Sequence, residues 1–195
     1  MIDFEPFVQV FGTPLSGTGV DLASLKLSQS IELQEFVTTI GSGCFSNGLL
    51  SIASQREQVS DLGGWEHWLP ASTYLFGSTC FGFLFCTSGN DLWLIDTHYG
   101  EIIESDFSIT DFINDLAQTD AQEDIVKISL FRSWYTLSGR SASDVVLSPT
   151  PAIPLGGSWD ISTLSPMPMS LYLPFTGQMF SSESGMPATV HRLQQ

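Results

Sequence analysis

The sequence predicts an α+β fold in which an antiparallel sheet, with strands at about residues 74–104, has helices packed on one side and a loop-rich carboxy-terminal strap. Three observations support this prediction. Aromatic-rich apolar runs joined by Gly-containing turns are typical of antiparallel strands. Apolar residues that recur every three or four positions after Asp106 are typical of amphipathic helices. Seven prolines from Pro149 onward argue against long helices in the last part of the chain.

The first part of the chain holds a predicted helix, a strand and a second, interrupted helix. Ser30 is a suitable N-cap for a helix with apolar residues on one face, and Gly41 is suited to end it. Residues 49–52 have the length and composition of a short strand. Residues 56–68 predict a helix that a glycine pair interrupts. We assign these elements to a first subdomain, residues 1–71.

The second part, residues 72–180, begins with a predicted antiparallel meander. Residues 80–86 and 91–96 are aromatic-rich runs, and the Gly-containing segment between them is typical of a hairpin loop. A turn then leads to a third short strand at residues 101–104. This meander provides the sheet of the predicted fold.

Two helices are predicted after the meander. Ser108 begins a pattern similar to a capping box before the helix at residues 109–116. A second start signal at Thr119 opens an apolar helical pattern that ends near Gly139. The prolines that follow predict a loop-rich strap with short elements, and we expect residues 181–195 to form a flexible tail.

The charge balance argues against several classes of protein. The 195-residue chain has 21 acidic residues, 6 Lys and Arg, and a formal net charge of −15. A nucleic-acid-binding protein needs basic residues to displace counterions from phosphates, and an anionic membrane surface repels such a chain. The first residues lack a basic signal region, and the apolar run at residues 81–86 is far shorter than a membrane span. We expect a cytoplasmic protein that binds neither nucleic acid nor membranes.

No catalytic or metal-binding motif is recognisable in the sequence. Phosphate-binding loops, zinc-binding patterns and nucleophile elbows do not occur. His67 and His98 are expected to be structural or surface histidines, and Cys44, Cys80 and Cys86 buried thiols. We therefore expect no enzyme activity, no cofactor and no metal, while a Cys/His pair assembled by the fold stays open.

Acidic residues are concentrated in the middle of the chain. Between Arg56 and Lys127 there are thirteen acidic residues and no Lys or Arg. Asp111 and Asp115 are spaced to share one helical face, where like charges repel. A field of one sign speeds the encounter with a basic partner and complements the phosphate-binding groove of a nuclease. The alternative is an acidic surface that serves solubility alone.

Two groups of residues resemble a known family. The helix ELQEF, a glycine-rich turn, FSNGLLSI and a Trp-bearing helix that ends before Pro70 resemble the GAD-like amino-terminal domain of bacterial immunity proteins. The second part is similar to the carboxy-terminal domain paired with it, through Phe76-Gly77, Gly82, Leu84-Phe85, Leu94-Ile95-Asp96, Tyr99-Gly100-Glu101 and Leu155-Gly156-Gly157. The resemblance covers about residues 4–175. It implies a GAD-like subdomain at 1–71 and a carboxy-terminal immunity domain at 72–180.

This domain pair is found in immunity proteins of type VI secretion systems that protect against antibacterial DNase effectors. The resemblance implies that the chain forms a hetero-complex with a cognate toxin, expected to be a basic nuclease domain, and covers its active site or substrate groove with an acidic surface. Binding at an exosite and blocked toxin assembly are alternative mechanisms. For the contacts we expect carboxylates and an aromatic anchor: Glu101, Glu104, Asp106, Asp111, Asp115, Trp65 and Trp68.

Two other classes of function stay open. A regulatory or scaffold module would bind a host protein or a small ligand in a pocket of the sheet. An uncharacterised hydrolase would need a site assembled by the fold, which the sequence does not reveal.

Overall fold

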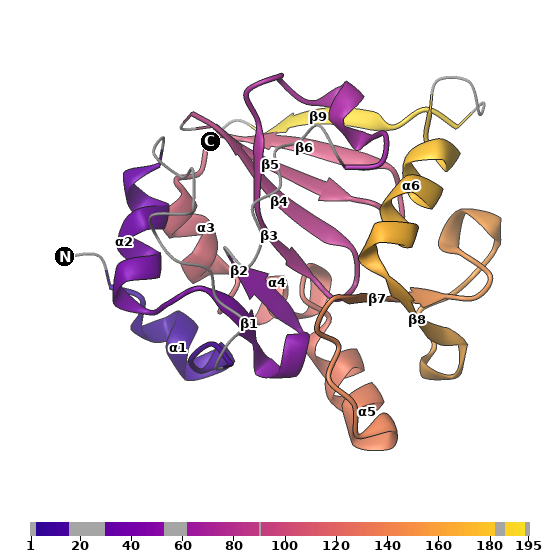
Figure 1. Cartoon of the computed structure of the whole chain (residues 1–195), viewed down its shortest axis with the longest axis horizontal. Helices are drawn as coiled ribbons and strands as arrows, with labels where there is room; N and C mark the ends of the chain where they lie inside the picture. The colour runs from indigo at the N-terminus through magenta and orange to yellow at the C-terminus, as the bar shows by residue number, and fades with distance from the viewer. Residues whose placement is uncertain (1–2, 16–29, 53–61, 90, 182–185, 194–195) are drawn as a thin grey trace.

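The computed structural model describes residues 3–15, 30–52, 62–89, 91–181 and 186–193, and these build a seven-stranded sheet with helices packed against it (Figure 1). The sheet has the order β1-β2-β3-β4-β5-β6-β9, and only β6 and β9 pair in parallel among these described strands. The predicted α+β fold with an antiparallel sheet is confirmed. The strands are β1 (Gly43–Phe45), β2 (Leu50–Ile52), β3 (Tyr74–Thr79), β4 (Phe83–Ser88), β5 (Asp91–Asp96), β6 (Glu101–Ser105) and β9 (Thr189–Leu193).

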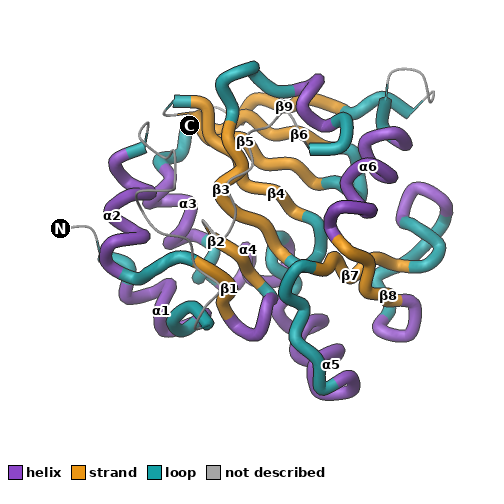
Figure 2. Tube along the Cα trace, viewed as in Figure 1, coloured by secondary structure: helices purple, strands orange, loops and turns teal. Residues whose placement is uncertain are grey.

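The remaining elements pack around this sheet (Figure 2). A second, two-stranded antiparallel sheet consists of β7 (Val145–Pro149) and β8 (Leu164–Pro168). The helices are α1 (Glu5–Phe11), α2 (Ile31–Thr39), α3 (Ile109–Asp115), α4 (Thr119–Asp124), α5 (Ile128–Ser138) and α6 (Met169–Met179). Short 3-10 helices are η2 (Ser46–Gly48), η4 (Trp65–Trp68), η5 (Ile153–Leu155) and η6 (Ile161–Thr163).

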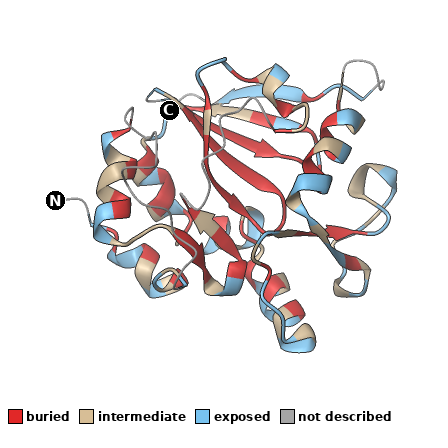
Figure 3. Cartoon of the chain, viewed as in Figure 1, coloured by how far each residue is buried: buried red, intermediate tan, exposed pale blue. Residues whose placement is uncertain are grey.

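The pleat of the sheet divides its apolar side chains between two cores. The central strands of the sheet are coloured mostly as buried in Figure 3. Leu92 and Leu94 of β5 belong to the first core, whereas Trp93 and Ile95 belong to the second. Helices α1, α2, α3 and α5 contribute to the first core, and η4 and α6 contribute to the second. The predicted helical layer therefore lies on one face, and α6 covers the opposite face.

The predicted helix starts are confirmed at two positions. Ser30 Oγ accepts a hydrogen bond from the backbone N–H of Leu33 at 3.3 Å, which caps α2. Ser108 Oγ accepts from the backbone N–H of Asp111 at 3.0 Å, which caps α3. The predicted helix after Thr119 divides into α4 and α5, because Lys127 adopts a left-handed conformation with φ of 54°.

The last part of the chain contains more regular structure than predicted. Helix α6 runs for 11 residues although it contains Pro174. The burial of Tyr172 and Leu173 in the second core stabilises it. Thr189–Leu193, which we expected in a flexible tail, instead form β9, which lies beside β6 in Figure 1. Both elements are stabilised by contacts with distant segments, which the number of prolines in the sequence does not predict.

The two predicted subdomains share one sheet. Strand β2 from the first pairs with β3 from the second, with Ser51 opposite Ser78. Residues from both parts also meet in the first core, where the Phe36 and Phe45 rings of the first lie with Phe85 of the second. The boundary near residue 71 therefore separates two stretches of sequence within one packed unit.

Two glycines provide a matched test of packing at strand ends. Gly100 has a φ of 68°, and a Cβ placed there would overlap the Phe180 ring. Gly89 has a φ of 65°, but a Cβ there meets nothing within 4 Å. We expect Gly100→Ala to lower the free energy of unfolding by about 2–3 kcal/mol and Gly89→Ala by about 1 kcal/mol. Urea unfolding measures both losses, and equal losses would contradict the predicted clash with Phe180.

Candidate functional site

Carboxylates gather around α3, on the first-core side of the sheet. Asp111 and Asp115 are exposed one turn apart on α3, and the exposed Asp106 lies between β6 and this helix. The start of the chain and α2 add one acidic residue each. We call this set the α3 acidic surface, and its members are Asp3, Glu32, Asp106, Asp111 and Asp115.

Hydrogen bonds between distant segments hold this surface together. The backbone N–H of Thr110 donates to the Glu32 carboxylate at 2.8 Å, across 78 residues of sequence. The side-chain amide of Asn114 donates to the backbone carbonyl of Asp3 at 3.0 Å, across 111 residues. Among the described residues, no Lys or Arg forms an ion pair with this surface. The salt bridge found among them joins Arg192 to Glu104, which does not belong to the surface. Within the described ranges, therefore, no Lys or Arg neutralises these carboxylates by direct contact.

A groove of about 400 Å³ opens between the starts of α2 and α3. Glu32 and Asp106 line it together with two exposed apolar side chains. Ile31 is 81% exposed and Phe107 is 41% exposed. The groove therefore combines apolar anchors with carboxylates inside the α3 acidic surface.

The structure brings together three of the predicted contact residues and separates the others. Asp106, Asp111 and Asp115 belong to the α3 acidic surface. Glu101 is exposed at the other end of β6. With a rise of roughly 3.3 Å per residue, it lies about 15 Å along the strand from Asp106. Its position beside the β5–β6 turn excludes it from the same contact cluster.

Glu104 and Trp68 lie on the second-core side. Strand alternation places Glu104 on the same face as Ile102, which belongs to the second core. The Glu104 carboxylate accepts a hydrogen bond from Arg192 Nε of β9 at 2.6 Å. Trp68 is partly exposed and packs against the second core. These two residues therefore face away from the α3 acidic surface.

The prediction that Trp65 is an interface anchor is wrong. Its side chain is fully buried, and its indole N–H donates to Thr176 Oγ1 at 3.1 Å. Its ring lies 5.7 Å from the Phe180 ring, centroid to centroid. Residues 53–61 lie outside the described residues, but Trp65–Trp68 form the 3-10 helix η4, which places Trp65 in the second core instead of on a longer helix.

The β5–β6 turn contains a buried polar network that local sequence patterns do not predict. The Asp96 carboxylate accepts the backbone N–H groups of His98 at 2.9 Å and Tyr99 at 3.2 Å. The Tyr172 hydroxyl lies 3.1 Å from His98 Nε2. The His98 ring packs edge-on against Trp159, with centroids 4.6 Å apart. Residues 97–100 predict only a turn, because Trp159 and Tyr172 come from distant segments of the chain.

Burial shifts the titration of this network. Burial lowers the pKa of His98 to about 3 and raises the pKa of Asp96 above its usual value. Burial also lowers the pKa of Lys127, whose ammonium lies 4.8 Å from the centre of the Trp159 ring, while Asp96 opposes that shift. His98 is 2% exposed, so this network does not present a base to solvent. Its hydrogen bonds instead connect α6 to the β5–β6 turn of the sheet.

The neutral state of His98 predicts a pH dependence of stability. The unfolded chain takes up a proton on this ring below about pH 6.5, whereas the folded protein does so only near pH 3. The free energy of unfolding should therefore fall by about 1.4 kcal/mol from this group between pH 7.5 and 5.5. Urea unfolding of the wild type and of His98→Asn at both pH values tests this. The variant should lack this part of the loss, and identical pH dependence would contradict the assignment.

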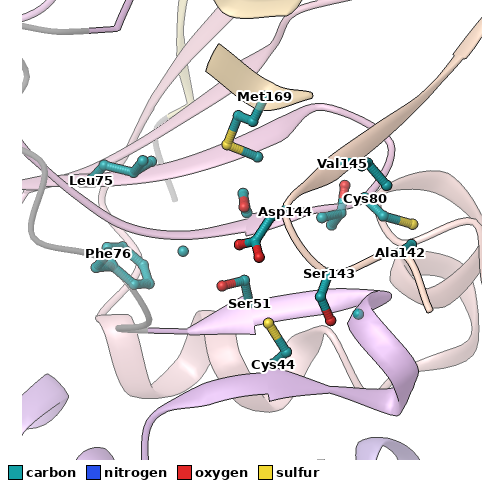
Figure 4. Close-up of a pocket in the computed structure, with 14 residues that line it drawn as sticks. Cys44, Ser51, Leu75, Phe76, Cys80, Ala142, Ser143, Asp144, Val145 and Met169 are labelled. Atoms are coloured by element: carbon teal, nitrogen blue, oxygen red, sulfur yellow. The ribbon is translucent and has the colours of Figure 1, made fainter. Parts of the chain in front are cut away.

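A small cavity lies between β1, β2, β3 and the segment before β7 (Figure 4). Its volume of about 30 Å³ is large enough for one or two water molecules. Cys44, Cys80, Ser51 and Asp144 are among the lining residues. Burial raises the pKa of the Cys80 thiol well above its usual value, which keeps it protonated. All three cysteines are buried outside any disulfide, which confirms the prediction of buried thiols.

Among the described residues, no group of three or more His, Cys, Asp and Glu side chains would hold a metal ion. No helix in the described part of the chain has the length and apolar character needed to cross a bilayer.

The fold and its surfaces define an acidic α+β protein with a helix-covered mixed sheet. The fold is similar to the crystal structure of Atu4351 from Agrobacterium tumefaciens, with a TM-score of 0.73 and 14% identity over 99% of this chain and 94% of that chain. No protein-family model matches the chain, and no curated protein matches it. At this identity the likeness establishes a shared fold.

Proposed function

We propose that this chain is an immunity protein that binds and neutralises a cognate antibacterial type VI secretion toxin, with a DNase as the expected target. The observation that carries the proposal is the α3 acidic surface. Its carboxylates come from three separate segments, and no described cation pairs with them. The family resemblance of the sequence supplies the biological setting.

The chemistry of DNA cleavage explains why this surface suits such a target. A DNase binds the phosphates of DNA through basic residues, so its substrate groove attracts a surface of carboxylates. The net charge of −15 adds a long-range attraction that speeds encounter. An inhibitor that covers the groove in this way excludes DNA by occupying the same basic residues.

Co-expression in a bacterium tests the proposal. The product of the neighbouring gene is co-expressed as the expected toxin, and survival, chromosomal DNA integrity and co-purification are scored. We expect the toxin alone to degrade the chromosome and co-expression to restore growth with a stable complex. Intact DNA with the toxin alone, or no complex with a nuclease-inactive toxin, would reject the proposal.

A second groove supports the alternative of a ligand-binding module. About 430 Å³ opens between α1, η2 and α5, which is within the size range of small-molecule sites. Leu49, Phe131 and Tyr135 line it together with Arg132, so a small anionic ligand with an apolar body would suit it. A thermal-shift screen of aromatic carboxylates tests this alternative, and Arg132→Ala is the matched control.

A further inference from the structure

We infer that the groove between the starts of α2 and α3 is the docking site for a short toxin segment that carries an arginine or lysine beside an apolar residue. This inference rests on the proposed function and assigns the partner chemistry of one place within the α3 acidic surface. It does not require that every carboxylate of that surface contacts the toxin.

The apolar part of the site is carried by two exposed side chains. Ile31 and Phe107 are 81% and 41% exposed and line the same groove of about 400 Å³. Large apolar side chains next to a concave surface are typical of the central contacts of an interface. By contrast, Leu33 and Phe36, which follow on α2, are fully buried in the first core. Among these three apolar residues of α2, only Ile31 is exposed, and it lies at the groove.

The groove favours a cationic partner over an anionic one. Backbone N–H groups at the two helix starts, which would otherwise bind an anion, already donate hydrogen bonds within the chain. Helix starts ordinarily attract anions through free backbone N–H groups. Here Ser30 and Ser108 accept hydrogen bonds from the first turns of α2 and α3. The backbone N–H of Thr110 donates to the Glu32 carboxylate at 2.8 Å. What the groove offers to a partner is therefore the negative charge of Glu32 and Asp106, and none of the lining residues that the structure describes is basic.

The same hydrogen bonds fix the walls of the groove. The contact of Glu32 with Thr110 joins the first turns of α2 and α3, and the Ser108 hydroxyl donates to the Asp111 carboxylate at 2.8 Å. A site whose walls are held before binding loses less conformational entropy on association. A second copy of this chain does not suit the site, because each copy carries a net charge of −15.

Serine substitutions at the groove and at a matched exposed leucine test the inference. Ile31→Ser and Phe107→Ser remove the apolar anchors, and Leu137→Ser removes a side chain that is 76% exposed on α5, outside the groove. Affinity for a nuclease-inactive toxin is measured by calorimetry, and circular dichroism confirms folding. We expect each groove variant to bind at least about tenfold more weakly and Leu137→Ser to change affinity by less than about twofold. Equal affinities for all variants would overturn the inference while leaving the proposed function intact.

A peptide experiment tests the groove without the toxin. A synthetic six-residue peptide of alternating arginine and leucine is titrated into the labelled protein, with alternating glutamate and leucine as the control. We expect amide shifts confined to residues 30–32 and 106–109 in the NMR spectrum, and their loss in Phe107→Ser. Shifts spread equally over the acids of α4, or unchanged in Phe107→Ser, would overturn the inference. Confined shifts together with a failed co-expression would support the groove and reject the immunity function.

Discussion

Replacing Trp65 with alanine is expected to lower the free energy of unfolding by about 3–5 kcal/mol. The side chain is fully buried in the second core, so its removal leaves a cavity beside the Phe180 ring. It also leaves Thr176 Oγ1 without the indole N–H that donates to it at 3.1 Å. Both effects act on the contact between η4 and α6.

Urea unfolding at 25 °C measures this loss. Trp68→Ala is the matched control, because Trp68 is partly exposed on the rim of the same core and should lose less than half as much. Trp65→Phe keeps most of the packing and should lose about 1–2 kcal/mol, which keeps the test informative if the alanine variant does not fold. If Trp65→Ala kept its stability and lost only toxin binding, the assignment of Trp65 to the core would be wrong.

Reversing the charge of Asp106 and Asp115 to lysine should slow association with the toxin about tenfold at low ionic strength. Both side chains are exposed on the α3 acidic surface, so the substitutions change the field and leave the core intact. Asp111 is left in place because its carboxylate accepts a hydrogen bond from the Ser108 hydroxyl at the cap of α3. The association rate is measured with a nuclease-inactive toxin by stopped-flow fluorescence.

The matched control reverses Asp120 and Asp124 on α4, which are also exposed and change the net charge equally. We expect this control to slow association by about twofold, because the charges lie outside the α3 acidic surface. Raising the salt concentration should bring the rates of both variants towards that of the wild type. Equal slowing by both variants would show that net charge alone, and not this surface, governs association.

Short-range signals predicted the elements whose stabilising contacts are local. Ser30 and Ser108 cap their helices through residues three positions away, so the sequence shows both partners. Helix α6 and strand β9 depend on contacts with distant segments. The number of prolines and the position near the end of the sequence therefore predicted loops and a flexible tail where these two elements form. The burial of Trp65 depends on Thr176, 111 residues further along the chain.

The same distinction applies to the candidate site. Asp106, Asp111 and Asp115 were predictable because they are close in sequence and precede or lie on one helix. Asp3 and Glu32 join them only through contacts across 111 and 78 residues. Alternation along β6 places Glu101 and Glu104 on opposite faces, so proximity in sequence did not mean a shared surface there.

The parallel pairing of β9 with β6 has a consequence for synthesis of the protein. Glu104 and its partner Arg192 are 88 residues apart, so the ribosome releases β6 long before β9. During that interval the outer edge of β6 carries unpaired backbone groups, and such an edge readily pairs with another chain. Completion of the sheet is therefore a late, non-local step of folding, and the nascent chain exposes the β6 edge until β9 pairs with it.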